Sequence, residues 1–453
     1  MRFCRAIDFA TASIAVVWLC RPVSLRAPEA TVLFDPDPQH VANRLYREVH
    51  IRAGPGGKKY GFDSLDPLLW SKTNYLLTGK SHAQPIALAD EFLSAHAERQ
   101  IRDPVKRAIL QRDIWAVFDW ADPSGHGDLH HHVERMELMA KLAPIVRRLA
   151  LSPDELATLP DTYARAVESH EFPAAYDLAS PNQAFLPSDL FDPRGPWVCL
   201  GAPERDLAAP LHDASFTARS VFMVFARLPG SRDATLAYFQ RLAQMKTPPF
   251  VSMQLPGFSQ RMEVWNPEVP QFPAGTEFAV VRQMILPDRV GVLRVTPVTE
   301  SVQIRHYIDI PKVDPMVSRD VGLARRFQEP SEIELNRQLL FSGQHSGLRG
   351  VKASDEPFLI FPAMAQGFDG LEEKRASMRP ISPFVECTGC HLGPGIQSMM
   401  SFSFRGNPNE GPVLSPRLAE TTAHQESEKV MEWAQGQDKW KDLVRLWSSE
   451  GPK

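Results

Sequence analysis

The chain has 453 residues, of which 43% are hydrophobic and 23% are charged, an ordinary globular composition with enough apolar residues to bury a large core. Its formal net charge is −4 at pH 7, and no block of Lys or Arg provides the basic stripe that a nucleic-acid-binding protein normally shows, so that class is excluded. Forty prolines against 26 glycines predict short elements joined by long ordered loops, because proline does not suit helix interiors or central strands.

The first 30 residues have the pattern of a secretory signal. Arg2 and Arg5 precede an apolar run from Ala10 to Cys20. A charged start and a short apolar run are typical of export signals, and this run is too short to span a bilayer. We therefore expect an exported protein, periplasmic or otherwise extracytoplasmic, with no transmembrane helix beyond an uncleaved leader. An ordinary apolar helix or strand at the start of the chain is the alternative.

A helical region follows a Pro-, Gly- and Asp-rich start. Residues 31–85 are expected to be irregular. Residues 86–100, IALADEFLSAHAERQ, have apolar side chains at helical spacing. Asp103 and Pro104 are a good N-cap and first residue for a helix over 105–121.

Two more helices are expected before the pattern changes. One runs through residues 128–151, with an interruption near Pro144. Ser152 and Glu155 then indicate the start of the next, since a serine three residues before a glutamate can cap a helix.

Two polar groups in this region are chemically suggestive. Asp113, Asp119 and Asp122 in RDIWAVFDW could be acid or base groups, but caps and surface charges on an amphipathic helix are the favoured interpretation. A histidine cluster could bind a divalent metal if it is helical, although a solvated surface is the favoured interpretation; its members are His126, His130, His131, His132 and Glu134.

Strands dominate the next part of the chain. Residues 218–228, 277–286, 291–299 and 301–310 are rich in Val, Ile and Thr and predict strands, with the sequences PDRV and PVTE as breaks between the last three. Residues 234–245 predict a helix between the first two strands.

The C-terminal third is mixed. One strand is expected over residues 357–361, PFLIF, and one or two helices over 418–447. The sequence therefore predicts an α+β fold with an N-terminal helical region, a central mainly antiparallel sheet, and a C-terminal binding loop followed by helices. The expected boundaries are 1–30 for the leader, 31–195 for the helical region, 196–380 for the sheet region and 381–453 for the last segment.

A cysteine motif lies in the last segment. The chain has five cysteines, and the two in the leader leave Cys199, Cys387 and Cys390, an odd number that does not suit a disulfide framework. Residues 387–391 read CTGCH. Two thiols separated by two residues, with a histidine directly after, match the spacing needed to bind both vinyl groups of a haem and its iron from one side.

Three other interpretations of the pair remain. A zinc site would need a second ligand pair, which the sequence does not supply at a recognisable spacing. A thioredoxin-like dithiol should open a helix after a strand, and HLGPGI is a poor helix start. A purely structural pair of cysteines needs no fixed spacing.

At residues 387–391 the sequence resembles c-type cytochromes. The resemblance implies one covalent haem c, with thioether bonds at Cys387 and Cys390 and His391 as the proximal iron ligand. Prolines precede the motif and only 62 residues follow it, so the larger protein is expected to hold the haem. The wider chain is similar to uncharacterised exported bacterial proteins that contain segments such as PQFPAGTEFAVVRQ and a late C-x-x-C-H, and this group lends no activity.

The opposite axial position is left open by the sequence. Met399 and Met400 are the nearest ligands, although a chain returning so soon after His391 must pass around the ring edge. An open sixth position is the alternative. Other side chains could also serve: Met364, Met378, Met431, His345 and His424. Apolar residues around the motif are expected to wall the pocket: Phe384, Val385, Leu392, Ile396, Phe402 and Phe404.

Three functions follow as hypotheses. The first is an exported mono-haem protein that transfers electrons with a redox partner protein or a small-molecule donor or acceptor. The second is a haem peroxidase-like enzyme with an open sixth iron position. The third is a non-catalytic exported module with a structural metal at the C-x-x-C. Whether the protein is an enzyme stays open.

Overall fold

The structure is a computed structural model that describes residues 33–53, 59–62, 74–123, 131–181, 183–202, 206–215, 219–246, 250–254, 259, 261–266, 268–310, 327–343, 345–351, 391, 395–399 and 418–447. The leader, Cys387, Cys390, Met400 and the strand expected over 357–361 lie outside these residues.

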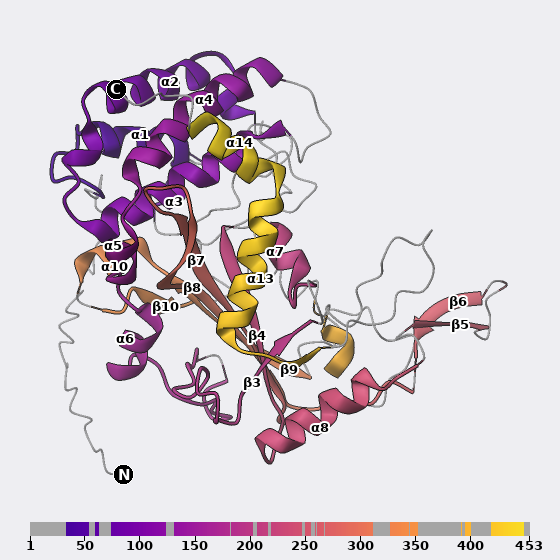
Figure 1. Ribbon diagram of the computed structural model, residues 1–453. Helices are drawn as coiled ribbons and strands as arrows, with labels where there is room; N and C mark the ends of the chain where they lie inside the picture. Colours follow the sequence, from indigo (N-terminus) through magenta and orange to yellow (C-terminus); the bar gives the residue numbers. More distant parts are fainter. Residues whose placement is uncertain are drawn as a thin grey trace, which may run out of the picture.

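A seven-stranded sheet lies at the centre of the fold (Figure 1). Its strand order is β10-β9-β8-β7-β4-β3-β11, and every neighbouring pair is antiparallel. Its strands are β3 (Val198–Gly201), β4 (Ser220–Arg227), β7 (Glu277–Pro287), β8 (Leu293–Tyr307), β9 (Gln328–Leu335), β10 (Leu348–Gly350) and β11 (Ala419–Glu420). Two small sheets pair β1 (Arg52–Ala53) with β2 (Lys59–Tyr60), and β5 (Phe250–Gln254) with β6 (Arg261–Trp265).

Helices precede, interrupt and follow the central sheet, which confirms the predicted α+β class. The N-terminal ones are α1 (Val41–His50), α2 (Gly79–Ser94), α3 (Pro104–Ala121), α4 (His132–Leu149), α5 (Pro153–Ala157) and α6 (Thr162–Glu168). The later ones are α7 (Pro210–Ser215), α8 (Arg232–Ala243), α10 (Arg337–Ser342), α13 (Ala423–Gly436) and α14 (Asp438–Trp447). Short 3-10 turns are η3 (Tyr75–Leu77), η4 (Ala97–Arg99) and η9 (Gly395–Ser398). Among the helices of the described part, none is long and apolar enough to cross a membrane.

The predicted helix starts at Asp103 and Ser152 are confirmed. The Asp103 carboxylate accepts a hydrogen bond from the Val105 amide at 2.8 Å, and Pro104 is the first residue of α3. Ser152 and Glu155 form a reciprocal capping box at the start of α5. Both caps satisfy amides that the first helical turn leaves without partners.

Three local expectations are wrong, and packing explains each. Residues 41–50, expected to be irregular, form α1, whose Leu45 and Tyr46 are buried in the core. Helix α4 continues through Pro144, because its neighbours are completely buried and packing outweighs the roughly 3 kcal/mol cost of an interior proline. Strand β8 continues through Pro297, which lies where the β7–β8 register shifts and no ladder hydrogen bond is needed.

Alternate residues of β4 define two faces of the sheet. On one face, Val221, Met223 and Phe225 pack with α1–α6, α13 and α14 in the larger core; we name it the helical face. On the other, Phe222 and Val224 pack with α8, η9 and the aromatic side chains of β7 and β8 in a second core; we name it the site face.

Candidate functional site

His391, the last residue of the cysteine motif, is fixed at both its backbone and its ring. Its carbonyl oxygen accepts a hydrogen bond from Gln328 Nε2 at 2.7 Å. Its ring Nδ1 lies 2.7 Å from the carbonyl oxygen of Ser398. A carbonyl oxygen only accepts, so Nδ1 holds the proton and the neutral ring keeps the lone pair on Nε2. This tautomer leaves Nε2 as the atom that can bind a metal.

The turn η9 presents the Ser398 carbonyl to His391. Gly395 begins the turn at φ +55°, in the left-handed region that favours glycine. The Ile396 amide donates to Gln271 Oε1 at 2.8 Å, and the Ser398 hydroxyl donates to the Gly395 carbonyl at 2.7 Å. Ile396, expected to wall the pocket, is buried in the site-face core. The other residues expected to form that wall lie outside the described part of the chain.

Met399 lies directly after this turn and is buried in the site-face core. Its sulfur accepts a hydrogen bond from the Tyr307 hydroxyl at 3.6 Å, and the same hydroxyl contacts Ser398 Oγ. The structure therefore brings His391 and Met399 to one polar junction around Ser398 and Tyr307.

The alternative ligands from the sequence lie elsewhere. His424 is 80% exposed on α13 and pairs with Glu428. His345 is exposed beside Glu171. Met431 packs against the core of the helical face. Met364 and Met378 lie outside the described residues.

His212, which the sequence did not single out, lies beside His391. It comes from α7, and its ring stacks on Phe222 of β4, with centroids 5.2 Å apart and planes 25° from parallel. The centroids of the His212 and His391 rings are 6.2 Å apart and their planes differ by 16°. No motif links the two histidines, so only the packing of α7 on the sheet reveals the pair.

Both histidines are held in their neutral form. Burial lowers the pKa of His212 to about 4, and the positive charges of Arg305 and Arg282 act in the same direction. Burial also holds the pKa of His391 well below its usual value, with Arg305 and His212 adding to the effect and the Ser398 carbonyl opposing it. Neutral imidazoles are the form that binds metal ions.

A layer of polar side chains from β8 and β9 continues from the histidines along the site face. The register places Gln303 opposite Glu332 and Tyr307 opposite Gln328. Arg305 Nη1 donates to Gln328 Oε1 at 3.0 Å, so one glutamine connects Arg305 to the backbone of His391. The alternating pattern of residues 301–310 predicts a strand. The polar face of such a strand usually meets solvent, so the sequence offers no reason to expect that the polar face of β8 is buried.

Two carboxylates of this layer are neighbours on β9. Burial raises the pKa of Glu332, although Arg305 and Gln303 act against it. Burial and the adjacent Glu332 raise the pKa of Glu334 well above its usual value. The pair therefore holds a proton more tightly than exposed carboxylates do.

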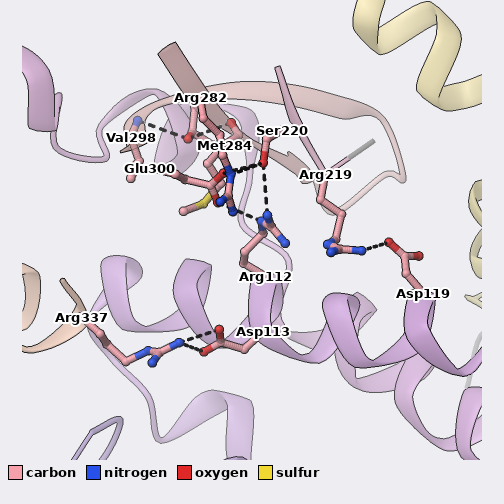
Figure 2. A network of polar contacts seen from close by, with 11 residues as sticks. Arg112, Asp113, Asp119, Arg219, Ser220, Arg282, Met284, Val298, Glu300 and Arg337 are labelled. Carbon is pink, nitrogen blue, oxygen red and sulfur yellow. Dashed lines mark hydrogen bonds and ion pairs between the residues drawn. The ribbon is translucent and has the colours of Figure 1, made fainter. Parts of the chain in front are cut away.

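A separate polar network joins α3 to the sheet (Figure 2). Arg112 Nε donates to Glu300 Oε1 at 3.0 Å, and Arg282 Nε donates to Glu300 Oε2 at 2.8 Å. Ser220 also contacts Glu300 and accepts a hydrogen bond from Arg112 Nη2 at 3.1 Å. Each oxygen of Glu300 thus has a guanidinium partner.

Two more buried ion pairs extend from α3. Asp113 accepts two hydrogen bonds from Arg337 Nη2, at 2.7 and 2.9 Å, and Asp119 pairs with Arg219 at 2.5 Å. The interpretation of these aspartates as surface charges is wrong, because every side chain from Ala108 to Ala121 is buried. They are structural ion pairs, since a charge this deep requires a partner.

The predicted histidine cluster is only partly described. His126 and His130 lie outside the described residues, and His131 precedes α4 in a left-handed conformation. Within the described ranges, no group of three or more His, Cys, Asp or Glu side chains is arranged to hold a metal ion.

Comparison with models of protein families, with curated proteins and with solved structures yields no match for this chain.

Proposed function

We propose that this chain is an exported, mono-haem c-type protein with an electron-transfer role. Cys387 and Cys390 would hold the porphyrin through thioether bonds, and His391 would bind the iron. The partner would be a redox protein or a small-molecule electron donor or acceptor. Its compartment would be the periplasm or another extracytoplasmic space.

The state of His391 is the observation that supports this proposal most. A histidine that binds metal through Nε2 is usually oriented by a hydrogen bond from its Nδ1 proton. His391 has that arrangement, with Ser398 as the acceptor. Burial keeps the ring neutral by lowering its pKa. The residue that follows the two cysteines is therefore prepared to be a ligand.

The chain's own residues would set the properties of the bound group. A haem supplies one-electron chemistry, and its potential depends on nearby charge, hydrogen bonding and burial. Gln328 and Ser398 hold the backbone and ring of His391. The charge of Arg305, which reaches both histidines, favours the less positive, reduced form.

Covalent attachment tests the proposal directly. The full chain is produced in an exporting host that can attach haem c, as wild type, Cys390→Ala and Cys199→Ala. Cys199 is a buried free cysteine on β3 and is the matched control. Intact mass and a pyridine haemochrome spectrum should show one covalent haem in wild type and in Cys199→Ala, and impaired attachment in Cys390→Ala.

Two results would reject the proposal. One is a wild-type protein without haem from a host that loads a known c-type cytochrome in parallel. The other is one equivalent of zinc in that haem-free protein, which would support a structural metal at the C-x-x-C instead.

A further inference from the structure

We propose that His212 is the second axial ligand of the haem iron, opposite His391. The inference rests on the proposed function, because it concerns the iron that the cysteine motif would hold. It adds a ligand from α7, a part of the chain far from the motif in sequence, and it replaces the open sixth position that the sequence left as an alternative.

The spacing of the two rings fits a shared metal. A metal–imidazole bond is about 2.0–2.1 Å, and the ring centre lies about 1.1 Å beyond the nitrogen, so two imidazoles bound on opposite sides of one metal have centroids about 6.3 Å apart. The centroids of His212 and His391 are 6.2 Å apart, and the rings are 16° from parallel. The centroid separation and the near-parallel planes of the two rings therefore agree with those of two imidazoles that bind one iron.

The ring nitrogens are also available. Among the described residues, neither nitrogen of His212 has a hydrogen-bond partner, and the same is true of His391 Nε2. A bound metal would satisfy one nitrogen of each ring.

The environment holds His212 ready to bind. Its ring is oriented by stacking on Phe222. No ordering of a mobile side chain is then needed on binding, which favours affinity.

Met399 is a weaker choice for the same position. It lies on the turn that orients His391 and follows that residue closely in the chain, so its sulfur would have to pass the ring edge to reach the opposite side. The sulfur also has a partner already, the Tyr307 hydroxyl at 3.6 Å. His212 lies on a separate element and has neither restriction.

Spectroscopy of the holo-protein separates the two ligands. We would prepare wild type, His212→Ala and Met399→Leu with covalent haem, which intact mass verifies in each. Wild type and Met399→Leu should be low-spin and six-coordinate by electron paramagnetic resonance and resonance Raman. His212→Ala should become high-spin, bind carbon monoxide about tenfold or more tightly because no internal ligand competes, and return to low-spin with added imidazole.

A second variant covers loss of folding in His212→Ala. His212→Met keeps a side chain that can bind iron and should raise the midpoint potential relative to wild type, because thioether ligation favours the reduced iron. A low-spin, unchanged spectrum in His212→Ala, or an unchanged potential in His212→Met, overturns the inference. A high-spin spectrum in Met399→Leu, or a high-spin wild-type protein that turns over peroxide, also overturns the inference.

The two proposals fail in different ways. Absence of haem from the wild type rejects the function itself. If haem is attached normally in every variant and the spectrum does not change when His212 is substituted, only the role of His212 is rejected.

Discussion

Charged side chains around α3 and the two histidines of the site face differ in the partners that they meet. Around α3, Asp113, Asp119 and Glu300 each face a guanidinium group at hydrogen-bond distance (Figure 2). On the site face, His212 and the Nε2 atom of His391 have no hydrogen-bond partner among the described residues. Buried charges with partners fix the position of a helix, whereas neutral, oriented rings with free lone pairs are suited to bind a metal.

The largest expected effect comes from breaking a paired charge. Asp113→Ala leaves Arg337 completely buried without its two-bond carboxylate partner, and we expect the free energy of unfolding to fall by about 3–5 kcal/mol. Urea denaturation measures the change. The control is Glu91→Ala, which breaks the exposed Arg44–Glu91 pair and should cost under about 1 kcal/mol. Equal losses in the two variants would contradict the structural role given to α3.

A smaller effect should follow from a methyl group at Gly395. Its Cβ would lie 2.2 Å from Gln271 Oε1 in a backbone of φ +55°. Gly343→Ala is a matched control, because Gly343 has φ +66° and open space around it. The control should cost about 1–2 kcal/mol from backbone strain alone. Gly395→Ala should lower the free energy of unfolding by more than the control does, and it should also disturb the η9 turn that orients His391. Thermal unfolding measures the first effect and the spectrum of the holo-protein the second. Equal losses of stability in the two variants, with an unchanged spectrum, would refute this prediction.

The like-charged pair on β9 predicts a pH effect. The native pKa of Glu334 is raised well above 4.5 by burial and by Glu332. The unfolded chain therefore loses this proton at a lower pH than the native protein does, so stability should fall as pH rises above about 4.5 until the raised pKa is passed. Glu334→Gln mimics the protonated group and lacks this penalty.

Denaturant titrations at several pH values test the effect. The variant should gain stability relative to wild type by up to about 1.4 kcal/mol per pH unit in that interval. A stability difference that stays constant from acidic to neutral pH would show that the carboxyl of Glu334 is not held protonated.

The smallest expected effect concerns the charge beside the histidines. If the haem is bound as proposed, Arg305→Gln should lower its midpoint potential by the equivalent of about 1 kcal/mol, because a nearby positive charge favours the reduced form. Arg305→Lys keeps the positive charge, so its midpoint potential should stay close to that of the wild type. Redox titration measures both, and equal shifts in the two variants would assign the effect to lost hydrogen bonding to Gln328.

Local signals in the sequence determined a large part of the fold. Asp103 with Pro104 and Ser152 with Glu155 act within a single helical turn, so the sequence alone predicts those helix starts. Alternation in residues 218–228 likewise predicts β4, and the paired cysteines with His391 select the candidate motif without any structure.

The tertiary structure decided which polar residues are buried and which partners they meet. Asp113 has the sequence context of a surface charge, and only the docking of α3 against Arg337 makes it an ion pair. His212 has no motif around it and reaches His391 only because α7 packs against β4. Caps and alternation depend on neighbours within a few residues, but burial and long-range pairing depend on how distant segments pack, which local spacing does not encode.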